Sequence, residues 1–444
     1  MMGKSLNLII RNGHIIDPSQ GIDGKGDLLV EEGKIKELSL DSSLGTQYDS
    51  THEIIDAGGL YVLPGLVDMH VHLREPGFEY KETIKTGTMA AVRGGFTSVC
   101  CMPNTKPVND NETVTEFILR KAYAEGACYV YTIGAITKGQ KGEELAEMGM
   151  MREAGCVAFS DDGYPVMNSL LMRRALEYSK VFGVTIISHA EDLNLSSCGV
   201  MNEGTLSLML GLRGIPAEAE VIAIKRDIEL AALTGGRLHI AHVSTAGGVR
   251  AIREARKDGL EVTAETCPHY FTLTEEAVMD YNTNAKVNPP LRTDRDVEAI
   301  KEGLSDGTID VIATDHAPHH MDEKLCEFDR AAPGISGLET ALPLCLGLVE
   351  EGVLSMSELV RKMALNPAGI LGMEKGSLKK DSTADIVLVD SHREFTVDSG
   401  EFVSMGKNTP FEGRQLKGGP VAVICKGRIY NMDNGILRDI QSFI

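Results

Sequence analysis

The sequence predicts an α/β protein: a (β/α)8 barrel with a small composite β-sandwich formed by both termini. Two observations predict this fold. Strand-like and helix-like segments alternate eight times in the middle of the chain, and both ends contain short strand-like segments between turn residues. The alternative, an open doubly wound sheet, is disfavoured because no glycine-rich dinucleotide or phosphate fingerprint follows the first middle strand.

The two ends of the chain are predicted to form β-structure. Residues 1–62 contain runs such as LNLIIRNGHIID and GDLLVEEGKIKEL, in which apolar stretches are separated by Gly, Asn and Asp. Residues 374–444 repeat this pattern in ADIVLVD and PVAVICKGRIYNM. The simplest arrangement joins both ends in one small β-sandwich, which leaves residues 63–373 for the barrel.

The middle of the chain provides the strands and helices of the barrel. Helical patterns such as KETIKTGTMAAVRGG and AEVIAIKRDIELAALTG lie between the strands, and several end in Gly, which is typical of a helix C-terminus. Crossovers of helical length join parallel strands, so the repeated unit predicts a closed parallel sheet. The predicted strands are 66–72, 98–104, 128–136, 156–162, 184–192, 237–244, 260–270 and 310–318.

Composition excludes several functional classes. Asp and Glu outnumber Lys and Arg by 64 to 44, which gives a formal net charge of −20, whereas nucleic-acid and anionic-membrane binders need a basic surface. No apolar run approaches the roughly 18 residues of a membrane span, and the N-terminus lacks the pattern of a signal peptide. The nine cysteines show no CxxC pair. We therefore expect a cytoplasmic protein with reduced thiols and no nucleic-acid or membrane partner.

Titratable side chains follow the predicted strands, at the end of a barrel where active sites form. The first strand ends in His70-Val71-His72, and the i, i+2 spacing places both imidazoles on one face. A lone histidine at such a position is more often a core residue, but burying several titratable groups together is costly without a compensating ion. The ends of the fourth, fifth, sixth and eighth strands carry Asp161 and Asp162, His189, His242, and Asp315.

These groups predict a divalent metal centre. Imidazole and carboxylate ligands suit Zn²⁺, Mn²⁺, Co²⁺ or Fe²⁺, of which Zn²⁺ is the commonest, and we expect one or two ions per chain. Four histidines and two or three carboxylates exceed one tetrahedral site and fit two ions that share a carboxylate. Such a centre makes hydroxide from water near neutral pH and polarises a carbonyl, while Asp315 is the best carboxylate to carry a proton to a leaving nitrogen. The site therefore predicts hydrolysis of an amide-type bond or the reverse condensation.

A set of motifs runs in order along nearly the whole chain: DMHVHLREPG (68–77), CCMPNT (100–105), FSDDG (159–163), SHAED (188–192), AHVST (241–245), CPHY (267–270), KVNPPLR (286–292), TDHAPH (314–319), PGISGLE (333–339) and NTPFEG (408–413). Together they resemble the dihydroorotases of the amidohydrolase superfamily, in the long bacterial form called class I. The resemblance implies the reversible interconversion of N-carbamoyl-L-aspartate and L-dihydroorotate in pyrimidine biosynthesis. It also implies a barrel with a composite β-sandwich, in agreement with the strand pattern.

The resemblance also implies a set of metal ligands, with Asp162 as the bridge between two ions. Many relatives in the superfamily use a carboxylated lysine as the bridge, in a sequence resembling FKxF. Here the stretch 157–162 contains no lysine, so we expect a carboxylate bridge, and Asp161 is the alternative to Asp162. The implied ligands are His70, His72, Asp162, His189, His242 and Asp315.

The substrate contacts implied by the resemblance are Arg74, Asn104, Asn288, His319 and Gly334. Arg74 and Asn104 follow the first two strands, and a guanidinium binds a carboxylate in bidentate fashion. Asn288 and His319 match substrate positions of the family, and Gly334 is expected to offer backbone groups to the ring amide. The polar segment 319–334 is expected to form a mobile loop over the site.

Three other functions are alternatives. Another cyclic amidohydrolase, an allantoinase or a hydantoinase-like enzyme, is disfavoured because Arg74 and the MPNT stretch favour a substrate that carries a carboxylate. An inactive dihydroorotase-like partner of aspartate transcarbamoylase typically lacks ligand histidines, which are all present here. A purely structural metal-binding barrel does not explain the polar residues around the site. We also expect a homodimer and an association with aspartate transcarbamoylase.

Overall fold

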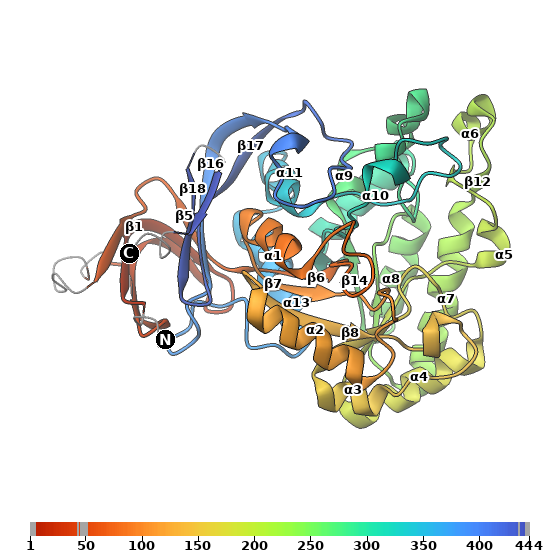
Figure 1. Ribbon diagram of the computed structural model, residues 1–444, viewed down its shortest axis with the longest axis horizontal. Coiled ribbons are helices and arrows are strands. Elements are labelled where there is room, and N and C mark those ends of the chain that lie inside the picture. Colours follow the sequence, from red (N-terminus) through yellow and green to blue (C-terminus); the bar gives the residue numbers. More distant parts are fainter. Residues whose placement is uncertain (1–5, 42–43, 45–51, 434–435, 440–444) are drawn as a thin grey trace.

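The computed structural model describes residues 6–41, 44, 52–433 and 436–439. Figure 1 shows a barrel surrounded by helices on one side and a β-sheet near both chain ends on the other. Among the described helices, none is both long and apolar enough to span a membrane.

Within the described residues, eight parallel strands follow one another around the barrel in the order of the chain. Each begins close to its predicted position but ends earlier, because the polar residues at its C-terminal end leave the sheet for the rim. The strands are β6 (Leu66–Val71), β7 (Phe96–Cys101), β8 (Tyr129–Gly134), β9 (Cys156–Ser160), β10 (Thr185–Ser188), β13 (Leu238–Ile240), β14 (Val262–Thr266) and β15 (Val311–Ile312). The predicted barrel is confirmed.

The seam between the last and the first strand brings two site segments together. Val71 forms a parallel bridge with His316, and the N–H of His72 donates to the carbonyl of His316 at 2.8 Å. The buried Asp68 carboxylate accepts the N–H groups of His70 and Thr314. The histidines at the end of β6 therefore lie directly beside the segment that follows β15.

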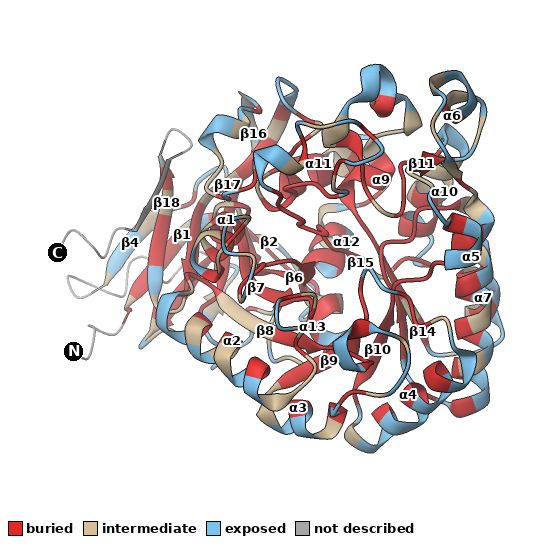
Figure 2. Cartoon of the chain, turned by 45° about the vertical axis from the view of Figure 1, so that its right-hand side comes forward, coloured by how far each residue is buried: buried red, intermediate tan, exposed pale blue. Residues whose placement is uncertain are grey.

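Helices cover the outside of the barrel, and Figure 2 shows their outer faces exposed around buried strands. Several begin at a side-chain cap: Thr83, Asn111 and Thr245 each accept a backbone N–H from the first turn. On α8, Val249, Ile252 and neighbouring small residues face the core. The helices are α1 (Ile84–Arg93), α2 (Glu112–Glu125), α3 (Met148–Ala154), α4 (Ser169–Phe182), α7 (Ala217–Thr234), α8 (Ala246–Lys257), α10 (Asp294–Ser305) and α11 (Leu338–Glu350), followed by the short α12 (Met356–Val360) and α13 (Asn366–Ile370).

Two insertions lie on the C-terminal side of the barrel strands. The first, between β10 and α7, contains α5 (Leu193–Ser196), β11 (Met201–Asn202), α6 (Thr205–Leu210) and β12 (Gly214–Ile215). The second, between β14 and α10, begins with α9 (Pro268–Thr272), so the strand predicted over 260–270 ends at Thr266. Proline is favoured in the first turn of a helix, and here Pro268 marks that start. Met201 and Tyr270 belong to one apolar cluster that joins the insertions.

The second sheet contains strands from both ends of the chain. In the described part of the chain its path is β19-β18-β17-β16-β5-β1-β2-β3, with β4 paired to β1. β5 and β16 pair antiparallel, with Val62 opposite Leu388, and this pairing joins the two ends. Leu8, Ile10 and Ile424 share its apolar core. The strands are β1 (Leu8–Asp17), β2 (Ile22–Glu31), β3 (Lys34–Ser39), β4 (Glu53–Asp56), β5 (Tyr61–Pro64), β16 (Ile386–Thr396), β17 (Gln415–Cys425), β18 (Arg428–Asp433) and β19 (Ile436–Asp439). The predicted separate β part built from both termini is confirmed.

Candidate metal centre and substrate site

Six buried side chains meet at the C-terminal rim of the barrel, counted among the described residues. They come from the ends of five strands, because the carboxyl ends of neighbouring parallel strands lie at one edge. The residues are His70 and His72 from β6, Asp162 after β9, His189 after β10, His242 after β13, and Asp315 after β15. The structure thus brings together every residue that the sequence singled out as a ligand.

Asp162 lies at the centre of this cluster. Its Oδ1 is 3.3 Å from His70 Nε2, 3.5 Å from His189 Nδ1 and 3.4 Å from His242 Nε2. Its Oδ2 is 3.5 Å from His72 Nε2. In the described part of the chain, two groups with metal-ligand spacing overlap at this carboxylate, His70–His72–Asp162 and Asp162–His189–His242. Asp162 is therefore the one side chain common to both.

Asp315 completes the half of the cluster nearest β6. Its Oδ1 lies 2.9 Å from His72 Nε2 and 3.4 Å from His70 Nε2. Asp315 and His242 have φ angles of +47° and +35°, and Arg74 has +63°, a region that non-glycine residues rarely adopt. Three of the chain's described non-glycine residues with positive φ thus lie at this site.

The chemistry of the donor set fits a divalent cation. Among the described residues, His70 Nε2 and Asp162 Oδ1 are buried side-chain atoms without a hydrogen-bond partner. His189 Nδ1 and His242 Nε2 face each other at 2.8 Å, both also near Asp162 Oδ1. Buried polar atoms without partners are costly, and a cation that accepts their lone pairs removes that cost. These atoms are nitrogen and carboxylate oxygen donors, as such a cation requires.

The mutual charges of the cluster are strong. Burial lowers the pKa of His70, but Asp162, Glu265 and Asp315 outweigh it and raise that pKa well above its ordinary value. Burial likewise favours protonation of Asp162, but His70 and the other imidazoles hold the pKa of this carboxyl well below its usual range. The carboxylates thus stabilise positive charge at the imidazoles, which is the charge that a bound cation supplies.

Oxygen acceptors bind the ring nitrogens that point away from Asp162. Glu265 on β14 lies 2.6 Å from His70 Nδ1, and Glu191 lies 3.0 Å from His189 Nε2. The side-chain oxygen of Asn104 is 2.9 Å from His72 Nδ1. Such partners fix the tautomer and the orientation of metal-ligating imidazoles.

Sequence reasoning missed Glu265 and Glu191 as site residues. Glu265 is a charged residue inside the buried strand β14, and this is the signal that would have found it. Glu191 stands two residues after His189 in SHAED.

Asp161, the alternative bridge, has both oxygens engaged elsewhere. Its Oδ1 accepts the N–H groups of Ile136 and Thr137, at 2.8 and 3.0 Å, and its Oδ2 accepts the Thr137 hydroxyl. It therefore ties the end of β9 to the end of β8, while the next residue, Asp162, points into the cluster.

Of the five predicted substrate residues, Asn104 and Asn288 lie beside cluster histidines, and the other three lie together at segment 317–319. Arg74 donates from Nε to the carbonyl of Pro318 at 3.1 Å, and its Nη2 is 3.2 Å from His319 Nε2. Asn288 donates to Glu191 at 3.0 Å, beside His189, and Asn104 contacts His72. Gly334, with φ of +143°, packs against Ala317 and the His319 ring.

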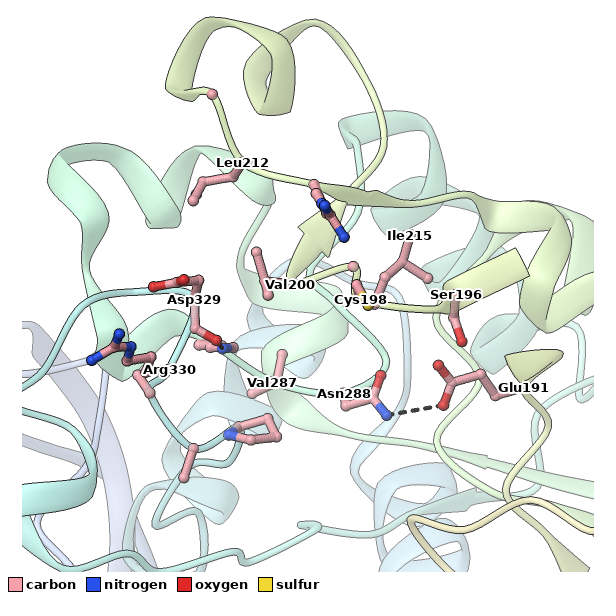
Figure 3. A pocket seen from close by; sticks show the side chains of 17 residues that line it. Glu191, Ser196, Cys198, Val200, Leu212, Ile215, Val287, Asn288, Asp329 and Arg330 are labelled. Atoms are coloured by element: carbon pink, nitrogen blue, oxygen red, sulfur yellow. Dashed lines mark hydrogen bonds between the residues drawn. The ribbon is translucent and has the colours of Figure 1, made fainter. Parts of the chain in front are cut away.

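A cavity of about 790 Å³ opens beside Asn288 and Glu191. Figure 3 shows these two side chains bonded at one end of it, with Val200 and Ile215 of the first insertion on one side. Residues 329–333 line the other side. The cavity lies between the first insertion and the predicted loop, and its lining includes Glu191, which contacts His189 of the cluster.

Two lysines tie the segment 319–334 to the second insertion. Lys286 donates from Nζ to the carbonyls of Phe328 and Asp329, at 2.7 and 3.1 Å. Lys324 donates to those of Thr283 and Ala332, at 2.9 and 2.7 Å. The segment follows a defined path over the site, and its mobility stays a prediction.

Known proteins resemble this chain along nearly its full length. Residues 59–247 match the family model described as Dihydro-orotase-like. The dihydroorotase of Geobacter metallireducens is 59% identical over 424 residues, 96% of this chain and 99% of the relative. The dihydroorotase of Acetivibrio thermocellus is 56% identical over 95% of this chain and 98% of the relative.

Solved structures share the fold. L-hydantoinase (dihydropyrimidinase) from Arthrobacter aurescens superimposes with a TM-score of 0.84 at 27% identity, over 94% of both chains. Dihydropyrimidinase from Brevibacillus agri gives a TM-score of 0.84 at 25% identity, over 98% of this chain and 96% of that one. The likeness covers the barrel and the separate sheet together.

Proposed function

The chain belongs to the dihydroorotase family, and from this premise we propose how its own residues carry out the family's reaction. The chain is a divalent-metal-dependent cyclic amide hydrolase, and the reaction is the reversible closure of N-carbamoyl-L-aspartate to L-dihydroorotate with loss of water. The curated relatives do not favour an allantoinase or hydantoinase activity, nor an inactive partner chain. The observation that carries the proposed mechanism is the position of Asp162 between two histidine groups.

We propose that the cluster holds two Zn²⁺ ions. His70, His72, Asp162 and Asp315 would hold one ion, and His189, His242 and Asp162 would hold the other. When bound, the ions supply Lewis-acid polarisation of the scissile carbonyl and acidify water near neutral pH. Support comes from the unpartnered donor atoms and from Asp161, whose oxygens are already engaged.

Asp315 is the proposed proton carrier. In the hydrolytic direction its carboxylate takes a proton from the attacking water and delivers it to the ring nitrogen as the amide bond breaks. In the condensing direction, with the reacting carboxyl group protonated, Asp315 takes the proton from the attacking ureido nitrogen and delivers it to the departing hydroxyl group, which leaves as water. Its Oδ1 is held by His72, which keeps the carboxylate at the cluster.

The remaining polar residues are proposed to bind the substrate carboxylate that does not react. Arg74 Nη2 lies 3.2 Å from His319 Nε2, and the side-chain oxygen of Asn104 lies beside His72 Nδ1. Burial and the Arg74 charge lower the pKa of His319, so its imidazole stays neutral and does not repel the guanidinium. Asn288 and the backbone of Gly334 are proposed to bind the ureide part.

Further features of the proposal concern the whole protein. We propose a cytoplasmic enzyme, a homodimer that associates with aspartate transcarbamoylase, and a chain divided at 1–62, 63–373 and 374–444. The nine cysteines, all within the described residues, are free thiols, which supports a reducing compartment. The dimer and the partner rest on the family resemblance.

A side-by-side rate assay tests the proposed function. The purified protein, loaded with Zn²⁺, is supplied with dihydroorotate, allantoin and hydantoin under one set of conditions. We expect kcat/KM for dihydroorotate to exceed both others by at least about 100-fold, because two or more polar contacts to the carboxylate are lost with the other substrates. Comparable rates for all three would overturn the assignment of Arg74 and His319.

A further inference from the structure

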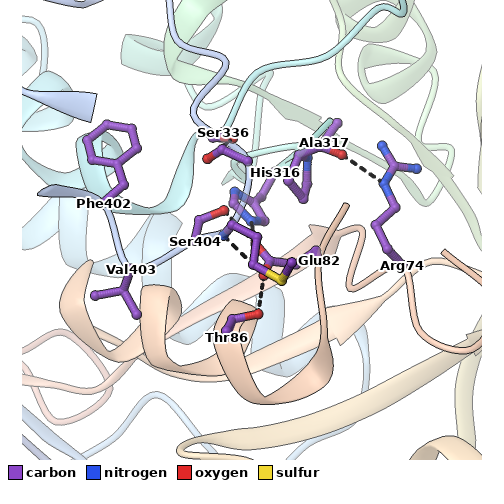
Figure 4. Close-up of polar contacts among 12 residues, drawn as sticks. Arg74, Glu82, Thr86, His316, Ala317, Ser336, Phe402, Val403 and Ser404 are labelled. Atoms are coloured by element: carbon purple, nitrogen blue, oxygen red, sulfur yellow. Dashed lines mark hydrogen bonds and ion pairs between the residues drawn. The ribbon is translucent and has the colours of Figure 1, made fainter. Parts of the chain in front are cut away.

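A long loop of the second sheet lies against the catalytic rim. Residues 402–411, between the turn Ser399–Glu401 and β17, include the start of the NTPFEG motif, to which no role was assigned. Two barrel carboxylates hold the start of this loop, as Figure 4 shows for Glu82 and Ser404. Glu339 accepts the N–H groups of Val403 and Ser404 at 2.9 and 3.0 Å. The loop is therefore fixed to the barrel before it reaches the site.

Asn408 of this loop is buried and bonded on both ends of its amide. Its Nδ2 donates to the carbonyls of Ala317 and Gly334, at 3.0 and 2.9 Å. Its Oδ1 accepts the N–H of His319 at 2.9 Å. A flipped amide would place donors against an N–H and an acceptor against two carbonyls, so these contacts define one orientation.

Ser336 adds to this connection. Its backbone N–H donates to the Asn408 carbonyl at 2.8 Å, and its hydroxyl lies 2.8 Å from the Gly406 carbonyl and 3.0 Å from Asn408 Oδ1. Ala317 in turn donates its N–H to the carbonyl of Ile335 at 2.8 Å. The segments 317–319 and 334–336 are thus held together, with Asn408 bonded to both.

Those two segments carry the proposed substrate contacts. The carbonyl of Pro318 accepts from Arg74 Nε, and His319 lies against Arg74 Nη2. The loop also approaches closely, since a Cβ at Gly406 would meet Pro318 Cβ at 2.5 Å and Cα at 2.8 Å. Asn408 and Gly406 therefore act on the backbone that sets the positions of Arg74 and His319.

We propose that Asn408 is a positioning residue for substrate binding, contributed to the barrel by the C-terminal part of the chain. It holds segments 317–319 and 334–336 at the spacing in which Arg74, His319 and Gly334 meet the substrate. This inference rests on the proposed function of those three residues. It assigns a role in substrate affinity to a residue of the second sheet's loop, outside the barrel strands.

The test compares two Asn→Asp variants of equal volume. Asn408→Asp turns the two donated bonds into repulsions against carbonyls. Asn366→Asp turns one donated bond into a repulsion at the opposite end of β15, where Asn366 Nδ2 donates to the carbonyl of Asp310 at 2.8 Å. Each Zn²⁺-loaded enzyme is measured for kcat and KM with dihydroorotate, for the Kd of orotate, a planar carboxylate analogue, and for Tm.

We expect Asn408→Asp to raise KM and the orotate Kd by about tenfold or more while kcat stays within about threefold. The buried carbonyls of Ala317 and Gly334 lose their donors, so the backbone that binds substrate shifts while the metal cluster keeps its place. Asn366→Asp should lower Tm while KM stays within about twofold. Unchanged KM and Kd in Asn408→Asp, or an equal rise in Asn366→Asp, would overturn the inference. If Asn408→Asp does not fold, Ser336→Ala carries the same test with an expected rise of about threefold, and an unchanged KM overturns it.

His319→Ala and Arg74→Ala separate this inference from the function on which it rests. If they weaken orotate binding and Asn408→Asp does not, the positioning role is wrong and the proposed substrate site stands. If neither weakens orotate binding, the proposed substrate site is wrong, and the positioning role is overturned with it. If all three weaken it, both are supported.

Discussion

The Glu265 carboxylate lies 2.6 Å from Nδ1 of His70, on the opposite ring nitrogen from the one that faces Asp162. The same carboxylate lies 3.2 Å from Nε2 of His239, and both partners are fully buried. A carboxylate in this place keeps the proton on Nδ1 and leaves the Nε2 lone pair free for a cation. The orientation of His70 thus depends on a residue from β14, a strand that carries none of the six cluster residues.

Glu265→Gln is expected to weaken metal affinity by about 10- to 100-fold, because the amide supports the imidazole less strongly than the carboxylate does. Competition between the protein and a chelator for Zn²⁺ measures this without an activity assay. Glu339→Gln, which removes a buried carboxylate away from the cluster, is the matched control. Equal affinities in the wild type and Glu265→Gln would show that Glu265 does not support the site.

Asp315→Asn is expected to reduce kcat by about 100- to 10,000-fold, the usual contribution of a positioned proton carrier. The orotate Kd should change little, and circular dichroism should show an intact fold, because the amide has the same shape as the carboxylate. Near-normal turnover in this variant would rule out Asp315 as the proton carrier.

Arg74→Lys is expected to raise KM for dihydroorotate by about tenfold or more, since a lysine cannot reproduce the planar bidentate geometry or the bond to Pro318. A cyclic ureide without a carboxylate serves as the comparison ligand, and inhibition constants for both are measured with each enzyme. We expect the inhibition constant to rise for the carboxylate ligand and to stay nearly unchanged for the ureide without a carboxylate. An equal loss for both ligands contradicts the assigned role.

The contribution of Glu339 to the free energy of unfolding depends on pH, and the direction follows from its pKa. Burial raises the pKa of Glu339 from 4.5 to about 7, against the opposing effects of Arg93 and the N–H groups of Ser404 and Val403. The folded state therefore holds this proton more tightly than the unfolded state does. Its contribution to stability is complete below about pH 4.5 and is lost as the pH rises through about 7.

Urea unfolding at pH 5, 6, 7 and 8 measures this effect. The free energy of unfolding of the wild type minus that of Glu339→Gln should fall with rising pH, by at most about 3 kcal/mol. Glu358→Gln is the control: the backbone and hydroxyl of Ser355 lower the pKa of Glu358, so this carboxyl stays ionised from pH 5 to 8 and the wild-type-minus-variant difference should stay flat. Parallel curves for the wild type and Glu339→Gln would mean that Glu339 does not titrate in this range.

The sequence was most informative where residue period and barrel geometry act together. The pair His70 and His72 shares a strand face by its spacing, and the ends of parallel strands meet at one rim, so the cluster could be predicted before the structure. The separate β part from both chain ends, predicted as a small β-sandwich, followed from strand-like runs and turn residues at the two ends. Both predictions depend on local patterns that can be read directly from the sequence.

Other features depend on contacts between distant segments. Glu265 supports His70 across 195 positions of the chain, and Asn408 reaches His319 across 89. Residues so far apart in the chain form no sequence pattern that would indicate their contact. The strand predicted to end at 270 stops at Thr266, because Pro268 begins a helix that no hydrophobic period indicated. Such features arise from tertiary packing, which one sequence does not display.

We propose that two cations share the Asp162 carboxylate. Zn²⁺ binding to metal-stripped protein, measured at saturation by elemental analysis after gel filtration, tests it most directly. We expect close to two equivalents of Zn²⁺ per chain for the wild type and no more than about one for Asp162→Ala. Asp161→Asn, if it folds, should bind close to two. Saturation of the wild type at one equivalent, or two equivalents retained in Asp162→Ala, would contradict it.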